Sequence, residues 1–327
     1  MRLPLSAMFL LQVLVTPAAA EFVSSSSVAE TRTRIEQLPE RDIWWTVNGQ
    51  AMAWHFKNLE RMYPTAPVYR DGPVRELARK PNPDIARARV KIDAGEFGFA
   101  ELIEGPHTTV MGIMIAHKGS VVFERYPRMR QHEKPIYWSV TKVMASALIG
   151  ILEAEGRIDS NQPVATYVPR LAKSSFGPIT VRNVADMAAG LDCLEDYKDT
   201  TSCYYRYSVT VGDGYFTADS PGDPYAMLEA LKVGSFAPQG TAWAYSGVNT
   251  FVLGWIIEEI TDMPFQDAVS RYFWTRMGAH SDAAFLAPRY GVPNVHGGLI
   301  ARIEDVIRFG MLFTHSAELL GAADVIP

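Results

Sequence analysis

The arrangement of apolar and polar positions is clearest from residue 110 onward. The run 110–116 is apolar and has the length of a strand, and the run 120–126 returns after Lys118 and Gly119. Gly119 can adopt the positive φ that tight turns require. The pattern therefore predicts a β-hairpin at the start of the main domain.

A long helix is predicted shortly after this hairpin. Apolar residues recur there at the three- and four-residue spacing of a single buried helix face. The residues predicted to point inward are Val140, Val143, Met144, Ala147, Leu148, Ile151 and Leu152. Gly156 is expected to end the helix.

The rest of the chain is mainly helical in its pattern. Thr180 is a candidate N-cap for a short helix that ends before Gly190. Further helices are predicted over 249–261, 264–274 and 303–314. Residues 192–222 are irregular, and so long an irregular stretch in a compact domain is usually functional. Strands at the front followed by helices indicate an α/β or α+β enzyme rather than a β-sandwich.

The first twenty residues have the pattern of an export signal. Arg2 supplies a positive start, a short apolar run extends from Leu5 to Val15, and Ala20 ends a group of small residues. A membrane anchor is the alternative, but the apolar run is too short to cross a bilayer, which takes ~20 apolar residues. We expect cleavage after Ala20 and a periplasmic or secreted protein.

Three segments are expected along the chain. Residues 1–20 form the signal peptide, residues 21–105 form an N-terminal extension that packs on the main domain, and residues 106–327 form the main domain. The formal net charge of −5 argues against nucleic acid as a partner. No later segment is apolar over the length of a membrane span. The oligomeric state is left open.

The two cysteines lie ten positions apart in the irregular stretch. Export permits a disulfide between Cys193 and Cys203, and closing so short a loop is easy, so the bridge is favoured over two free thiols. Two cysteines, and histidines without ligand spacing, argue against a zinc site.

Ser139 and Lys142 form the sharpest chemical motif, at the start of the long predicted helix. Positions i and i+3 share a helix face, so the lysine amine can reach the serine hydroxyl. A serine becomes a good nucleophile when a base takes its proton, and burial and the positive end of a helix both favour the neutral lysine that could do so. Ser-x-x-Lys also occurs by chance in many chains. Its position after a hairpin and at the start of a long helix is what favours a catalytic role.

Tyr245 is a second candidate, on a loop that follows the turn-forming stretch 238–241. A tyrosine beside a lysine ammonium can act as a proton relay. The alternative is a tyrosine packed in the core.

The order of these features is distinctive. The hairpin is followed by Ser139-x-x-Lys142, the Thr180-to-Gly190 helix, Pro238-x-Gly240-Thr241-x-x-x-Tyr245-Ser246 and Gly297-Gly298-Leu299. From about Thr109 onward the chain resembles the serine β-lactamase-related family, which includes class C β-lactamases, DD-peptidases, esterases and 6-aminohexanoate-dimer hydrolases. The last branch is nearest, on the motifs Tyr63-Pro64-Thr65-Ala66-Pro67 and Glu195-Asp196-Tyr197.

The resemblance implies a two-lobed fold, with an all-α lobe and an antiparallel sheet flanked by helices. It implies a serine hydrolase for a small amide or ester, acylated on Ser139, with Lys142 as base and Tyr245 passing a proton to the leaving group. The choice between Lys142 and Tyr245 as acylation base stays open. No cofactor and no metal are implied. His296 and Tyr197 are candidate substrate-binding residues.

Two departures from the family pattern matter. The family commonly has Tyr-x-Asn, whereas Gly247 stands third here and Asn249 follows two residues later, so these two are further candidates for the substrate site. The family also continues into late sheet strands that carry a Lys-Thr-Gly or His-x-Gly motif. We expect those strands to be missing here and this chain to be weakly active or inactive. The alternatives are a penicillin-binding DD-peptidase or β-lactamase, and an inactive relative with a binding role.

Overall fold

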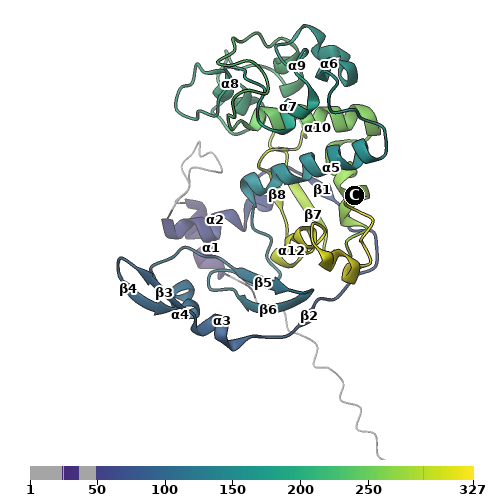
Figure 1. Cartoon of the computed structure of the whole chain (residues 1–327). Helices are drawn as coiled ribbons and strands as arrows, with labels where there is room; N and C mark the ends of the chain where they lie inside the picture. Colours follow the sequence, from purple (N-terminus) through teal and green to yellow (C-terminus); the bar gives the residue numbers. More distant parts are fainter. Residues whose placement is uncertain (1–23, 25, 37–48, 290) are drawn as a thin grey trace, which may run out of the picture. The chain divides into compact units, whose positions relative to one another are not determined.

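The computed structural model describes residue 24 and residues 26–36, 49–289 and 291–327. The expected signal peptide and its cleavage site lie outside the described residues. The chain divides into a short unit, residues 1–37, and a large unit, residues 38–327. The short unit contains helix α1, Val28–Glu36. All other elements belong to the large unit (Figure 1).

The large unit combines helices with short strands. Its α-helices are α2 Met52–Phe56, α3 Pro83–Arg87, α4 Phe99–Glu104, α5 Lys142–Ala154, α6 Val164–Tyr167, α7 Val181–Ala185, α8 Cys203–Thr210, α9 Pro224–Glu229, α10 Gly247–Thr261, α11 Phe265–Val269 and α12 Ile303–Met311. Its strands are β1 Thr65–Val68, β2 Ala78–Arg79, β3 Arg89–Ile92, β4 Gly95–Gly98, β5 Ile113–His117, β6 Ser120–Arg125, β7 Ala283–Leu286 and β8 Leu299–Ile300.

The predicted hairpin is confirmed. Strands β5 and β6 pair antiparallel around Lys118 and Gly119, both of which have positive φ. The sheet order is β2-β6-β5, and β2 joins β6 in parallel, so this sheet is mixed rather than purely antiparallel. A separate hairpin, β3-β4, completes this region.

A second three-stranded sheet joins segments far apart in the chain. Strand β1 pairs antiparallel with β7, and β7 pairs with β8, in the order β1-β7-β8. Strand β1 belongs to the expected N-terminal extension. The extension therefore contributes an edge strand to a sheet of the main domain, where we had expected it only to pack on that domain.

Helices α6 to α10 gather on one side of α5, and the two sheets and α12 lie on its other side (Figure 1). Helix α10 is buried over most of its length and packs on α5. This division into a helical part and a part built from sheets and helices agrees with the predicted two-lobed fold. In the described ranges no strand follows α12.

The buried face of α5 differs from its prediction at the front. Val140 and Val143 are 50% and 43% exposed, whereas Met144, Leu148, Ile151 and Leu152 are buried as predicted. The turn over Trp138–Thr141 is a 3₁₀ helix, and α5 begins only at Lys142. Three residues per turn place Val140 off the α-helical stripe, and Val143 lies on the exposed side of the first turn of α5, between the buried Lys142 and Met144.

The irregular stretch 192–222 contains a helix that the pattern did not predict. Helix α8 begins after Ser202, whose side chain caps the Tyr205 amide, and it buries Tyr204 and Tyr207. Tyrosines spaced three apart lie on one helix face, so they supply the apolar surface that aliphatic residues supply elsewhere. In the part of the chain that is described, no helix has the length and apolar character needed to cross a membrane.

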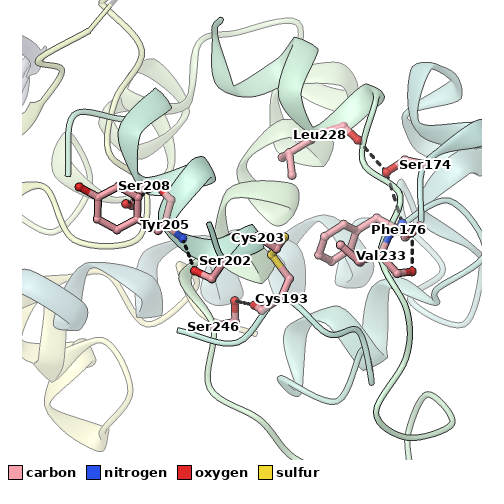
Figure 2. Close-up of a disulfide and its surroundings, with 11 residues drawn as sticks. Ser174, Phe176, Cys193, Ser202, Cys203, Tyr205, Ser208, Leu228, Val233 and Ser246 are labelled. Carbon is pink, nitrogen blue, oxygen red and sulfur yellow. Dashed lines mark hydrogen bonds between the residues drawn. A yellow bond between two sulfur atoms is a disulfide. The ribbon is translucent and has the colours of Figure 1, made fainter. Parts of the chain in front are cut away.

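The disulfide predicted between Cys193 and Cys203 is present, with Cα atoms 5.0 Å apart. Figure 2 shows it beside Ser246, whose hydroxyl donates to the Cys193 carbonyl at 2.8 Å. The bridge closes the loop that carries Glu195 and Tyr197. The disulfide thus ties this loop to α8, and the Ser246 hydrogen bond ties it to the start of α10.

Helix α12 carries a buried charge cluster. Arg308 is fully buried and contacts Glu304 at 2.8 Å, Asp305 at 3.0 Å and the Arg75 carbonyl at 2.8 Å. Arg79 also contacts Glu304, at 3.0 Å. The cluster thereby joins α12 to the segment that precedes β2, because the charges satisfy one another inside the fold.

We predict that Arg308→Ala lowers the free energy of unfolding by ~3–5 kcal/mol, because it leaves Asp305 buried without its ion-pair partner and Glu304 with Arg79 alone. Arg170→Ala is the control, since the Arg170–Glu229 pair is exposed and worth only ~0–1 kcal/mol. Urea titration followed by circular dichroism measures both. Equal losses in the two variants would show that the buried cluster contributes no more to the free energy of unfolding than an exposed ion pair.

We predict that replacing Cys193 and Cys203 together by serine destabilises the protein by ~2–4 kcal/mol. The bridge restricts the unfolded chain and closes the loop that carries Glu195 and Tyr197. Thermal unfolding of the double variant, beside wild type with and without reductant, tests this. Reduction that lowers the melting temperature of both proteins equally would contradict it.

Candidate active site

Ser139 lies in the 3₁₀ turn that leads into α5, and it is exposed to solvent. The residue before it, Trp138, has φ +46°, a left-handed conformation that costs a non-glycine residue ~1–3 kcal/mol and that concentrates at functional sites. The Trp138 ring packs edge-on against Phe56, with centroids 4.9 Å apart. This packing helps to hold the turn that presents Ser139.

Three hydrogen bonds fix this turn to the segment around β8. The Tyr137 amide donates to the Leu299 carbonyl at 2.8 Å, and the Leu299 amide donates to the Thr141 hydroxyl at 3.1 Å. Lys142 donates to the His296 carbonyl at 2.7 Å. These bonds bring the Ser-x-x-Lys motif next to the segment from His296 to Leu299, with a separation of 154 positions between Lys142 and His296.

Lys142 is the first residue of α5 and is 8% exposed. Its Nζ lies 2.9 Å from Ser139 Oγ, within hydrogen-bond distance. The i, i+3 spacing thus places the amine at the serine hydroxyl, as the sequence led us to expect. The second partner of Nζ, the His296 carbonyl, fixes the direction of the lysine side chain.

Tyr245 lies beside Lys142, with the lysine Nζ 4.8 Å from the centre of its ring. The Ala244 amide donates to Met187 at 2.8 Å, which fixes the loop before Tyr245 on the turn after α7. Tyr245 is 36% exposed, and among the described residues its hydroxyl has no hydrogen bond to Ser139 or Lys142. The ring, rather than the hydroxyl, therefore faces the lysine.

Ser139 opens onto a cavity of about 200 Å³. The cavity is lined by Trp138, Ser139, Glu195, Tyr197, Asp213, His296 and Gly297. Among the candidate substrate-binding residues, Tyr197 and His296 lie here. His296 is buried, not a surface histidine, and its two ring nitrogens face Asp213 and Tyr207.

The cavity wall is acidic and aromatic. Burial raises the pKa of Tyr197, and the negative charges of Asp213 and Glu195 raise it further. Tyr197 is therefore a phenol at neutral pH, and its hydroxyl lies 2.9 Å from that of Tyr204. One carboxylate oxygen of Glu195, Oε2, is buried with no hydrogen-bond partner in the described structure.

Asn249 and Gly247 do not line this cavity. Asn249 is buried in α10, and its amide nitrogen lies 3.5 Å from the Met187 sulfur. Gly247 packs under the His296 ring, where an added Cβ would be 2.8 Å from Cδ2. The Asn249 amide is thus directed at Met187 and does not line the cavity beside Ser139.

Sequence reasoning did not select Asp213 as a site residue, and it quoted Glu195 only as part of a motif. Both are acidic residues in the irregular stretch, and Asp213 is enclosed by Gly212 and Gly214. The position of Asp213 between two glycines in an irregular stretch is the sequence feature that could have identified it. The local sequence does not show that Asp213 is buried beside a histidine 83 positions away.

The chain is similar to several known proteins. A family model described as "Beta-lactamase" matches residues 99–325. The chain is 30% identical over 262 residues to the 6-aminohexanoate-dimer hydrolase of Paenarthrobacter ureafaciens, covering 79% of this chain and 64% of that protein. It is 20% identical over 169 residues to the "Putative penicillin-binding protein PbpX" of Bacillus subtilis, covering 51% of this chain and 37% of that one.

A solved structure supports the fold. The "Putative 6-aminohexanoate-dimer hydrolase from Bacillus anthracis" superposes with a TM-score of 0.71 at 22% identity, over 81% of this chain and 69% of that one. The chain spans just under two thirds of the first curated relative. The family match covers most of the chain, including the Ser139 turn, the cavity wall and α12. This chain belongs to the β-lactamase family of serine hydrolases.

Proposed function

We propose that this protein cleaves an amide or ester bond of a small molecule through an acyl-enzyme on Ser139. The observation that carries the proposal is the 2.9 Å contact between Ser139 Oγ and Lys142 Nζ at the wall of a cavity. An exposed hydroxyl, a nearly buried amine and a space for the reacting carbonyl are the parts that nucleophilic catalysis requires.

The proposed reaction has two halves. Lys142 Nζ accepts the Ser139 proton as Oγ attacks the carbonyl carbon, and the bond to the leaving nitrogen or oxygen breaks as that atom gains a proton. Water then attacks the acyl carbon, the Oγ–carbon bond breaks, and the acid product leaves with Ser139 restored. We assign the delivery of that proton to Tyr245, whose ring lies beside Lys142 at the exposed edge of the site.

A linear amide is the favoured substrate class. Support comes from the relative named 6-aminohexanoate-dimer hydrolase, with 30% identity over most of this chain. The cavity of about 200 Å³ suits one narrow part of such a molecule. The disulfide supports a periplasmic or secreted location, because such bridges persist in oxidising compartments.

A penicillin-binding or β-lactamase function is the second candidate, favoured by the similarity to a putative penicillin-binding protein. Gly247 counts against it, because the space above this residue is filled by His296 and Tyr204 rather than by an asparagine side chain. An inactive relative that only binds ligands is the third candidate. The Ser139–Lys142 contact counts against that one.

We predict that a fluorophosphonate labels wild type at Ser139 and that Ser139→Ala removes the label. Lys142→Ala should slow labelling by ~100- to 10,000-fold, because the base is lost. Peptide mass spectrometry locates the adduct. The N-cap of this turn is Tyr137 rather than Ser139, so Ser139→Ala should change stability by less than ~0.5 kcal/mol.

A fluorescent penicillin used in parallel separates the three candidates. Label from the fluorophosphonate alone agrees with the proposal, whereas label on Ser139 from both probes indicates the penicillin-binding function. A wild-type chain that is folded and unlabelled by either probe would refute a hydrolase. Near-normal labelling of Lys142→Ala would refute the lysine as base.

We predict that Tyr245→Phe lowers turnover of a p-nitroanilide more than turnover of the matching p-nitrophenyl ester. A poor leaving group such as an amine needs a proton, and a phenolate does not, so the amide should lose ~100-fold or more. Trp243→Phe, at a more exposed ring on the same loop, is the control. Equal losses on both substrates would remove Tyr245 from proton delivery.

A further inference from the structure

Ser139, His296 and Asp213 line one cavity, which is the composition of a Ser-His-Asp triad. His296 Nε2 lies 2.9 Å from Asp213 Oδ2, as a triad would require. In a triad the other ring nitrogen faces the serine. Here His296 Nδ1 lies 3.0 Å from the hydroxyl of Tyr207 instead. Both ring nitrogens are engaged away from Ser139, so the imidazole is not placed to take its proton.

The side chains of Asp213, His296 and Tyr207 form a buried network. His296 and Asp213 are 3% and 2% exposed, and Tyr207 is fully buried. Asn294 donates to the second oxygen of Asp213 at 3.1 Å. Burial raises the pKa of Tyr207, with a further rise from the charge of Asp213, so Tyr207 is a phenol. His296 thus has a partner at each ring nitrogen, Asp213 at Nε2 and Tyr207 at Nδ1.

The backbone of His296 contacts the catalytic lysine. Its carbonyl accepts from Lys142 Nζ at 2.7 Å, and the same Nζ contacts Ser139 at 2.9 Å. Gly297 and Gly298 follow directly, and their amides donate to the Asn294 carbonyl at 3.3 and 2.8 Å. The direction of the His296 carbonyl therefore depends on this backbone turn together with the contacts of the His296 ring to Asp213 and Tyr207, which we call the clamp.

Gly247 closes the clamp from the side of α10. An added Cβ would lie 2.8 Å from His296 Cδ2, 2.9 Å from Cγ and 2.9 Å from the Tyr204 hydroxyl. A larger residue here would displace the ring. Glycine at this position and the buried histidine thus form a matched pair, on two elements about 50 residues apart.

We propose that Asp213, Tyr207 and His296 are positioning residues that hold Lys142 at Ser139 through the His296 carbonyl, with Gly247 leaving room for the ring. This inference rests on the proposed function, since it assigns a role in the reaction of Ser139. Because the network does not face the cavity as a base, its loss should impair the chemical step more than substrate binding.

The test uses three variants that disturb the clamp from different elements: Asp213→Asn, Tyr207→Phe and Gly247→Ala. Each should lower kcat for a p-nitrophenyl ester, and the rate of fluorophosphonate labelling at Ser139, by ~10- to 100-fold, the effect of a small misplacement of a catalytic group. KM should change little, because the effect falls on the chemical step. Rates are normalised to folded protein by circular dichroism.

Matched controls make the same chemical changes elsewhere. Tyr205→Phe removes a hydroxyl from the same helix, α8, where its partner is the Tyr215 amide rather than His296. Gly150→Ala adds a methyl group to α5 at a position with no atom within 4 Å. Both should keep wild-type kcat. Should Tyr207→Phe fail to fold, Gly247→Ala, which leaves every hydrogen-bonding group in place, tests the same clamp.

The outcomes separate the inference from the function that it rests on. A wild-type chain that never labels refutes the hydrolase and the clamp together. Normal labelling of wild type with unchanged kcat in the three variants refutes the clamp alone. A rise in KM without a fall in kcat would make the network a substrate contact. If His296→Ala were as inactive as Ser139→Ala while Lys142→Ala stayed active, His296 would be the base and the proposal would fail.

Discussion

The contact between the Ser139 turn and the segment that ends in β8 is the constraint on which the site depends. Two backbone groups of Leu299 and the carbonyl of His296 bind the turn at Tyr137, Thr141 and Lys142. Helix α5 is thereby fixed at its first residue as well as along its buried face. A nucleophile that is exposed to solvent can be held precisely in this way, because the groups on either side of it are not free to move.

Much of this fold can be predicted from local patterns. The β5–β6 hairpin follows from an apolar run, a glycine turn and a second run, and α5, α10 and α12 follow from their apolar spacing. The reach of Lys142 to Ser139 follows from helix geometry in the same way. The disulfide follows from two cysteines in one stretch. These features depend on residues close together in the chain, and local sequence patterns can therefore predict them.

Other features depend on contacts that the local pattern cannot encode. Strand β1 finds its partner β7 more than 200 residues later, and the exposed Val140 and Val143 reflect a 3₁₀ turn that apolar spacing does not reveal. Tyr245 was placed near Lys142 only through the order of motifs shared with a family. Asp213 and Tyr207 became visible as partners of His296 only once their burial together was known. Buried polar networks join distant elements, so they are the part of a site that sequence patterns describe least.

The packing of Phe56 on Trp138 bears on how this protein can be divided. The family match begins at residue 99, yet the ring that braces the left-handed Trp138 belongs to α2, and the Phe56 carbonyl also accepts from the Ile136 amide at 3.1 Å. The family model and the structural support of the Ser139 turn thus have different boundaries in this chain. A fragment that began at residue 99 would keep every catalytic candidate but lose the Phe56 ring and the edge strands β1 and β2, so expression trials and fusion proteins should retain the residues from α2 onward.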